Sequence, residues 1–173
     1  KIGDRVILHW QKSEGYDSCC PNYFMGKKKI NAGKVTTFNE FAVVSENRIT
    51  RIPKGISEKQ AVIFGCALTT GFGAVVYDAK VKNNKSILIF GAGGIGMSLI
   101  QILGLMKPKK IIIVDSNINK KKIIKKFKQK DFILFKNNDF SKLKEKILNK
   151  NNGNYFDYVF DTTGSGRIIE LGL

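Results

Sequence analysis

The chain has 173 residues and a formal net charge of +16, and 43% of its residues are hydrophobic. These values are ordinary for a globular protein with one domain, or one domain and part of another. Apolar runs such as 111–114 are too short to cross a bilayer, and no secretory signal is recognisable, so we expect no membrane partner. The chain does not begin with Met, and it starts and ends within apparent elements, so we expect a fragment of a longer protein.

Three cysteines, Cys19, Cys20 and Cys66, do not form an even disulfide framework. Free thiols are typical of a reducing compartment, so we expect a cytoplasmic protein. No CxxC pair occurs, which argues against a structural zinc site of the four-cysteine type.

The strong positive charge raises the possibility of a basic nucleic-acid-binding protein, because phosphate neutralisation dominates such binding. The densest lysine runs are 120–130 and 142–150, where apolar residues recur at helical spacing. That pattern is typical of solvated faces of amphipathic helices. We therefore expect no nucleic-acid partner and keep the basic binding protein as an alternative.

The first part of the chain is rich in strand patterns. A strand is predicted over 5–10, and alternating residues predict short strands over 37–44. Ser57 and Gln60 are spaced as a capping box that opens a helix, and helical periodicity follows over 61–79 with an interruption near Gly65.

From residue 86 onward the pattern alternates between apolar strands and amphipathic helices. This alternation predicts a parallel α/β sheet, and we expect a β-rich domain over 1–60 and a cofactor-binding domain over 61–173. The expected strands are 86–90, 110–115, 132–135 and 156–161, separated by helices near 94–106, 119–129 and 140–150.

A glycine-rich motif, GAGGIG, lies between the first of these strands and its helix. Gly91 would permit a tight turn, Gly93 would let the backbone approach a pyrophosphate, and Gly96 would allow close packing of helix on strand. Gly94 lies in the same motif, at the amino end of the helix, whose free N–H groups attract a pyrophosphate. The motif predicts a dinucleotide site.

Asp115 ends the second strand of this region, where a carboxylate can bind the adenosine ribose hydroxyls of a dinucleotide. Its negative charge would repel a 2′-phosphate, so NAD is favoured over NADP. Lys120 is a further candidate ribose contact, with a plain surface lysine as the alternative.

The segment 65-GCALTTGFGAVVYDAKVKNNKSILIFGAGGIGMSLIQILGL-105 resembles the medium-chain, zinc-containing alcohol dehydrogenases. A weaker match continues through GDRV, TTFNEFAVV, IIIVD and YVFDTTG. The resemblance implies a Rossmann-type doubly wound parallel sheet, incomplete in this chain, preceded by part of a β-rich, GroES-like catalytic domain.

The resemblance also implies site residues. Cys66 matches one of the family's three protein ligands to a catalytic Zn²⁺ in the interdomain cleft, and Thr70 matches a catalytic-site threonine beside the nicotinamide. The cofactor-contacting positions that match are Gly91, Gly93, Gly94, Gly96, Asp115, Thr162, Thr163 and Gly164.

Some expected residues are missing. The family's other two zinc ligands would precede residue 1, and His9, the only histidine, cannot replace them, so we expect it to be structural. The segment 12–29 stands where many members carry a four-cysteine lobe, and we expect Cys19 and Cys20 to be inert thiols.

The function expected from the resemblance is hydride transfer between an alcohol, or its carbonyl product, and NAD, assisted by zinc in the full-length protein. We expect a small-molecule substrate, a homo-oligomer when full length, and an inactive fragment. The alternative within the superfamily is a zinc-free reductase that acts on quinones or activated double bonds.

Overall fold

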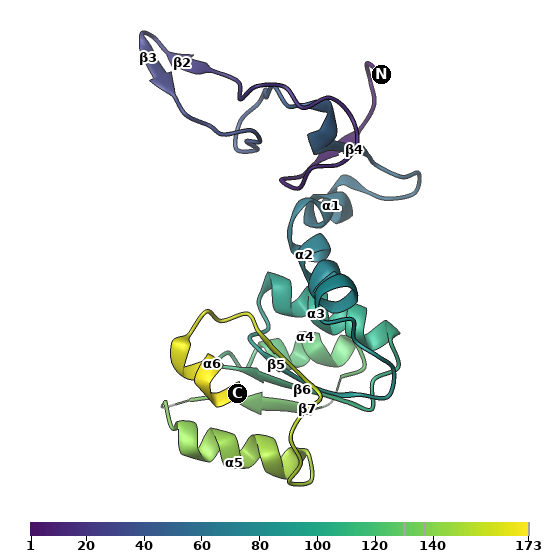
Figure 1. The fold of residues 1–173 in the computed structure, drawn as a ribbon, viewed down its shortest axis with the longest axis vertical. Coiled ribbons are helices and arrows are strands. Elements are labelled where there is room, and N and C mark those ends of the chain that lie inside the picture. The colour runs from purple at the N-terminus through teal and green to yellow at the C-terminus, as the bar shows by residue number, and fades with distance from the viewer. Residues whose placement is uncertain (130, 137, 173) are drawn as a thin grey trace. The chain divides into compact units, whose positions relative to one another are not determined.

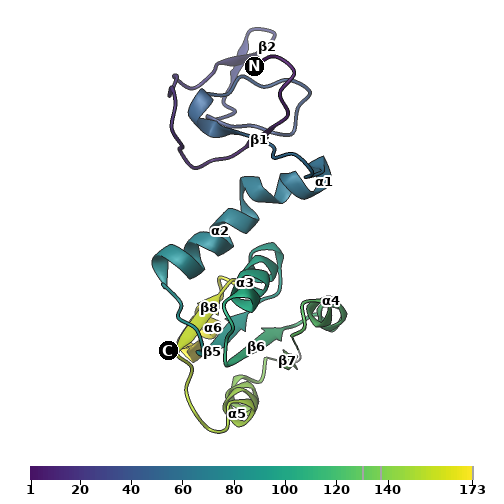
Figure 2. The same cartoon turned by 90° about the vertical axis from the view of Figure 1, so that its right-hand side faces the viewer.

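The computed structural model describes residues 1–129, 131–136 and 138–172. The chain divides into two compact units, Lys1–Thr69 and Thr70–Leu173, which we name the N-terminal and the C-terminal unit (Figures 1 and 2). Their junction lies later in the chain than the change of character near residue 60, since the helical turns that follow contact strand β1. The assignment of these units to a catalytic and a cofactor domain stays a prediction.

Short antiparallel strand pairs make up the regular structure of the first fifty residues. β1 (Val6–Leu8) pairs with β4 (Ile49–Arg51), which follows the 3₁₀ turn η1 (Glu46–Arg48). β2 (Tyr23–Met25) and β3 (Lys28–Ile30) form a hairpin. Strands therefore occur in this region as predicted, but each has three residues, and β1 is shorter than the predicted strand.

The strands predicted over 37–44 are wrong, because that segment contains no strand. Phe38, Phe41 and Val43 are 105%, 86% and 65% exposed. Alternation produces a strand only where a neighbouring strand supplies hydrogen-bond partners and packing, and the ladders of the described residues do not extend here. Among the described residues of the N-terminal unit, Ala61 is the only buried hydrophobic side chain.

The predicted capping box at the start of the first helix is confirmed. The Gln60 amide donates to Ser57 Oγ at 3.4 Å, and the Ser57 amide donates to Gln60 Oε1 at 3.0 Å. Side chains thereby accept from two amides at the start of the helix, which fixes the start of α1 (Glu58–Ala61).

The helical run then continues in three pieces, η2 (Val62–Gly65), α2 (Ala67–Gly73) and the π-helical η3 (Ala74–Asp78). The predicted interruption is confirmed at Cys66, whose φ of −148° is not helical. A Cβ on Gly65 would collide with a backbone carbonyl of β1. Among the described residues, no single helix is long and apolar enough to cross a membrane; only the two arms of this run taken together have that length and composition.

The C-terminal unit is built on a four-stranded parallel sheet with strand order β7-β6-β5-β8. Its strands are β5 (Ser86–Phe90), β6 (Lys110–Asp115), β7 (Asp131–Leu134) and β8 (Tyr158–Asp161). The first strand of this unit, β5, lies inside the sheet between β6 and β8. That order is the one expected for one half of a doubly wound sheet and a switch in winding direction.

Helices cover both faces of this sheet (Figures 1 and 2). α3 (Gly94–Leu105) and α4 (Lys120–Lys126) lie on one face, and α5 (Phe140–Lys150) and α6 (Gly166–Gly172) lie on the other. The Rossmann-type α/β fold predicted from the sequence is therefore confirmed.

The core of the unit explains both the continuous apolar strands and the lysine-rich helices. Every residue of β5 is buried, as expected for a strand covered on both faces. In α5, Leu143 and Ile147 are buried while most of the lysines are exposed. The cluster on the α5–α6 face comprises Leu88, Phe90, Ile112, Val114, Ile133, Leu143, Ile147 and Ile168.

A carboxylate joins the amino ends of β5 and β8. Asp157 Oδ1 accepts from Lys85 Nζ at 2.8 Å, while Oδ2 accepts from the amide and the hydroxyl of Ser86, both at 2.8 Å. The Lys85 ammonium first, and then the Ser86 donors, hold the pKa of the Asp157 carboxyl well below its ordinary value of 3.8. The same contact raises the pKa of Lys85.

Because the pKa of Asp157 is depressed in the folded chain, its contribution to stability is present above the unfolded value of 3.8 and is lost as pH falls through the folded value. We expect Asp157→Asn to lower the free energy of unfolding at pH 7 and to approach the wild type as pH falls below 3.8. Urea denaturation at several pH values measures this. Asp78→Asn, at an exposed carboxylate, is the control, and an equal loss in both variants would contradict the account.

Candidate functional site

The carboxyl ends of β5 and β8 lie side by side and are followed by segments that leave on opposite faces. β5 leads through 91–93 into α3, and β8 leads through 162–165 into α6, on the other face of the sheet (Figure 2). Such a switch point leaves a crevice outside the strand ends, where ligands bind in open α/β sheets.

The glycine loop after β5 leaves room for side chains at some positions and none at others. Gly91 has φ +89°, and a Cβ on it would lie 2.5 Å from Thr162 Oγ1. A Cβ on Gly96 would collide with the Gly91 carbonyl oxygen. Gly93 is different: it is exposed, and a Cβ there would meet nothing within 4 Å. Gly91 and Gly96 are therefore required by the fold itself, whereas Gly93 leaves space over the amino end of α3.

Thr162 ties the two strand ends together. Its hydroxyl lies 3.0 Å from the Phe90 carbonyl oxygen and 3.2 Å from the Gly91 carbonyl oxygen, and it donates toward both. Its amide also donates to the Phe90 carbonyl at 2.9 Å. The Thr162 hydroxyl proton is thus engaged inside the protein, and the predicted cofactor contact at this residue stays a prediction.

Asp115 lies at the end of β6 and contacts the glycine loop directly. Its Oδ2 accepts from the Ala92 amide at 2.7 Å, and its Oδ1 accepts from the Asn117 amide at 2.7 Å. The side chain is half-buried. Each carboxylate oxygen can accept a further hydrogen bond, so the group can brace the loop and still bind a hydroxyl. Lys120 is the first residue of α4 and is half-buried.

A cavity of about 460 Å³ opens beside Asp115, within the C-terminal unit. Two of its aromatic walls, Phe135 and Phe140, contact each other edge to face with ring centroids 5.1 Å apart. Mostly apolar walls with a few polar groups suit a flat ring that carries a hydroxylated sugar. The lining residues are Phe90, Gly91, Val114, Asp115, Ser116, Phe135, Lys136, Asn138, Phe140, Thr163, Ser165 and Ile168.

Asp161, at the end of β8, is a residue that the sequence reasoning missed. Its carboxylate accepts hydrogen bonds from Thr163 and Gly164 in the turn that follows. Asp before Thr-Thr-Gly is a turn signal, because an Asp side chain bonds readily to backbone amides two or three residues on. Gly164 has φ +67°, and it and Thr163 are exposed.

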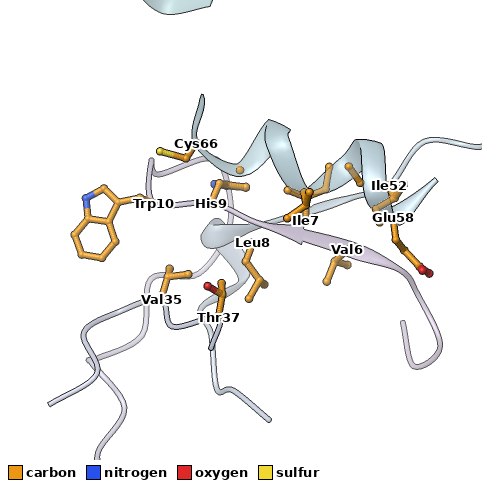
Figure 3. A pocket seen from close by; sticks show the side chains of 13 residues that line it. Val6, Ile7, Leu8, His9, Trp10, Val35, Thr37, Ile52, Glu58 and Cys66 are labelled. Carbon is orange, nitrogen blue, oxygen red and sulfur yellow. The ribbon is translucent and has the colours of Figure 1, made fainter. Parts of the chain in front are cut away.

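In the N-terminal unit, Cys66 lies at the edge of a second cavity, of about 560 Å³, between β1 and the helical run. Figure 3 shows its side chain at one end of this cavity and Glu58 at the other. The Cys66 thiol is exposed and free. The described residues contain no group of three or more His, Cys, Asp or Glu side chains able to hold a metal, so this chain offers one donor at Cys66 rather than a zinc site.

His9 also lines this cavity, and both of its ring nitrogens are engaged. Nδ1 lies 2.7 Å from the Gln11 carbonyl oxygen and Nε2 lies 2.9 Å from Thr50 Oγ1. A carbonyl can only accept, so Nδ1 donates to Gln11, while Nε2 shares a hydrogen bond with the Thr50 hydroxyl, which can donate or accept. These contacts support the structural role that we expect for His9.

Thr70 is an exposed residue of α2 and belongs to the C-terminal unit, whereas Cys66 belongs to the N-terminal unit. The glycine next to it, Gly71, is required for packing, because a Cβ there would lie 2.8 Å from the Cβ of Ser98 in α3. Cys19 and Cys20 are exposed free thiols.

Comparison with known proteins gives both sequence and structural relatives, although no family model matches the chain. The chain is 34% identical over 141 residues to S-(hydroxymethyl)glutathione dehydrogenase of Saccharomyces cerevisiae, a match that covers 80% of the chain and 36% of the relative. The chain therefore spans little more than a third of the length of this relative.

Two solved structures share the fold. Zinc dependent alcohol dehydrogenase 2 from Streptococcus pneumonia superposes with a TM-score of 0.67 at 22% identity, covering 76% of this chain and 37% of that one. The CurK enoyl reductase superposes with a TM-score of 0.64 at 21% identity, covering 75% and 37%.

The glycine loop permits a test of which glycines the fold requires. Gly96→Ala should lower the free energy of unfolding by about 2 kcal/mol or more, since its Cβ meets backbone that has no room to move. Gly93→Ala should change it by less than about 0.5 kcal/mol, because its Cβ meets open space. Chemical denaturation of both variants measures the difference. Equal stability of the two variants would show that the loop is not packed as described.

Proposed function

Because this chain belongs to the medium-chain, zinc-containing alcohol dehydrogenase family, we propose that it forms the NAD-binding part of an enzyme that transfers a hydride between an alcohol, or its carbonyl product, and NAD. The observation that carries the proposal is the juxtaposition of the open glycine loop, Asp115 and the 460 Å³ cavity at the switch point of the sheet. Since the chain covers 36% of its yeast relative, the activity belongs to the whole protein.

The residues of this chain fit a dinucleotide. The exposed Gly93 and Gly94 stand at the amino end of α3, where free N–H groups and the helix dipole favour a pyrophosphate. Asp115 can accept from the adenosine ribose, and the cavity beside it can take the adenine. NAD supplies the chemistry when it is bound, by accepting or donating the hydride. The chain's residues hold and orient the cofactor, and Thr70, Thr163 and Gly164 are proposed contacts.

The carboxylate of Asp115 supports NAD as the cofactor rather than NADP. An NADP 2′-phosphate would place a second negative charge against this side chain, which already occupies the space between the loop and residue 117. Lys120, half-buried at the start of α4, is proposed as a further ribose contact.

Cys66 is proposed as one thiolate ligand of a catalytic zinc whose other ligands come from outside this chain. Support comes from its family motif and from its exposed thiol at the rim of a cavity. The described residues by themselves do not fit a zinc site, so no step of the reaction is assigned to the metal here. We expect the chain alone to be inactive for the same reason.

The substrate, assembly and location are proposals of the same kind. The yeast relative is named S-(hydroxymethyl)glutathione dehydrogenase, and for the whole protein we propose a small-molecule alcohol or carbonyl substrate. We further propose a homo-oligomer in the cytoplasm, supported for location by three free cysteines among the described residues.

Removing the charge of Asp115 tests the choice of cofactor. Asp115→Asn keeps the shape and an oxygen that can accept from the Ala92 amide, but it removes the repulsion of a 2′-phosphate. We expect the ratio of NADH to NADPH affinity to fall about tenfold or more, by fluorescence titration. An unchanged ratio would mean that Asp115 only braces the loop.

Zinc content tests Cys66 without relying on activity. In the full-length protein, Cys66→Ser should remove bound zinc from the catalytic site and abolish alcohol oxidation, while NADH affinity stays within about twofold because its determinants lie in 91–96 and 115. Cys19→Ser, at another exposed free thiol, is the matched control and should keep both zinc and activity. Equal zinc content in wild type and Cys66→Ser would contradict the ligand assignment and favour a zinc-free reductase.

A further inference from the structure

One carboxylate organises the whole turn that follows β8. Asp161 Oδ1 accepts from the amide of Thr163 at 3.0 Å and from its hydroxyl at 2.6 Å, and Oδ2 accepts from the amide of Gly164 at 3.0 Å. Hydrogen bonds to a charged acceptor are roughly twice as strong as neutral ones. Three of them on one side chain hold the turn in a single conformation.

The network continues from this carboxylate to the wall of the cavity. The Ser165 amide donates to Thr163 Oγ1 at 3.2 Å, so Thr163 both donates to Asp161 and accepts from Ser165. Thr163 and Ser165 line the 460 Å³ cavity that Asp115 also lines. Asp161 is not among the lining residues but orients two residues that are.

We propose that Asp161 is a positioning residue for the adenosine half of the cofactor, an inference that rests on the proposed function. A turn that is already ordered loses less conformational freedom when the ligand binds, and its side chains need not rearrange. Thr162, which donates to the Phe90 and Gly91 carbonyls, connects the same turn to the glycine loop. Asp161 therefore orients the residues of the turn that line the cavity, while Thr162 holds this turn against the glycine loop.

The alternative is that Asp161 only stabilises the fold, and the same strand provides a matched comparison. Asp157 precedes β8 and also accepts three side-chain or backbone hydrogen bonds, but it lines neither cavity described here. Loss of Asp157 should weaken the fold as a whole, whereas loss of Asp161 should loosen mainly the turn that follows β8. Only loss of Asp161 should weaken binding in the cavity.

The 173-residue chain is titrated with AMP and with NADH, and the affinities of wild type, Asp161→Asn and Asp157→Asn are compared. We expect Asp161→Asn to bind both ligands about tenfold more weakly, since an amide can no longer accept all three hydrogen bonds. Asp157→Asn should bind both within about twofold of wild type, although its urea midpoint is lowered. Equal affinity of Asp161→Asn and wild type would overturn the inference while leaving the proposed function intact. Absence of saturable AMP and NADH binding by wild type would overturn both.

Amide hydrogen exchange gives a readout that needs no ligand. In Asp161→Asn the amides of Thr163 and Gly164 should exchange at least about tenfold faster, and the Ser86 amide should keep its wild-type rate. If all three amides accelerate together, the carboxylate stabilises the sheet as a whole and the positioning role is overturned.

Discussion

The close contact between the glycine loop and the start of α3 is the constraint on which the C-terminal unit depends. The Gly91 carbonyl occupies the place where a side chain of Gly96 would be, and Thr162 fills the place where a side chain of Gly91 would be. Two strand ends and one helix thus meet through backbone atoms and a single hydroxyl. This contact places the amino end of α3 at the crevice outside the carboxyl ends of the strands. An anion bound in that crevice would face the free N–H groups of the helix.

Around this contact, charged side chains act at both ends of the sheet. Asp157 fastens the amino ends of β5 and β8, whereas Asp115 and Asp161 organise the loops at the carboxyl ends. Asp115 lines the cavity, and Asp161 holds Thr163, which lines it, so the groups that shape the loops also shape the cavity. In the function that we propose, the same residues serve fold stability and cofactor binding at the carboxyl ends of the strands, whereas Asp157 at the amino ends serves stability alone.

Much of the C-terminal unit could be predicted from the sequence. Buried parallel strands produce continuous apolar runs, and the glycine spacing reflects contacts that leave no room for Cβ atoms, so β5 and α3 began where expected. The N-terminal unit was less predictable. The alternation near Phe38 and Phe41 does not form a strand, because pairing depends on neighbours distant in sequence. Asp161 was missed, although the order Asp-Thr-Thr-Gly signals a turn, because the sequence does not show that this turn forms part of the cavity wall.

A chemical-shift map of the 173-residue chain titrated with NADH tests most directly whether the carboxyl ends of β5, β6 and β8 form a dinucleotide site. We expect saturable shifts of the backbone amides over 91–96, at 115–116 and over 163–165, which surround the cavity and the exposed end of α3. Saturable shifts confined to other parts of the chain, or no saturable shifts at all, would contradict the assignment of this edge of the sheet as a dinucleotide site.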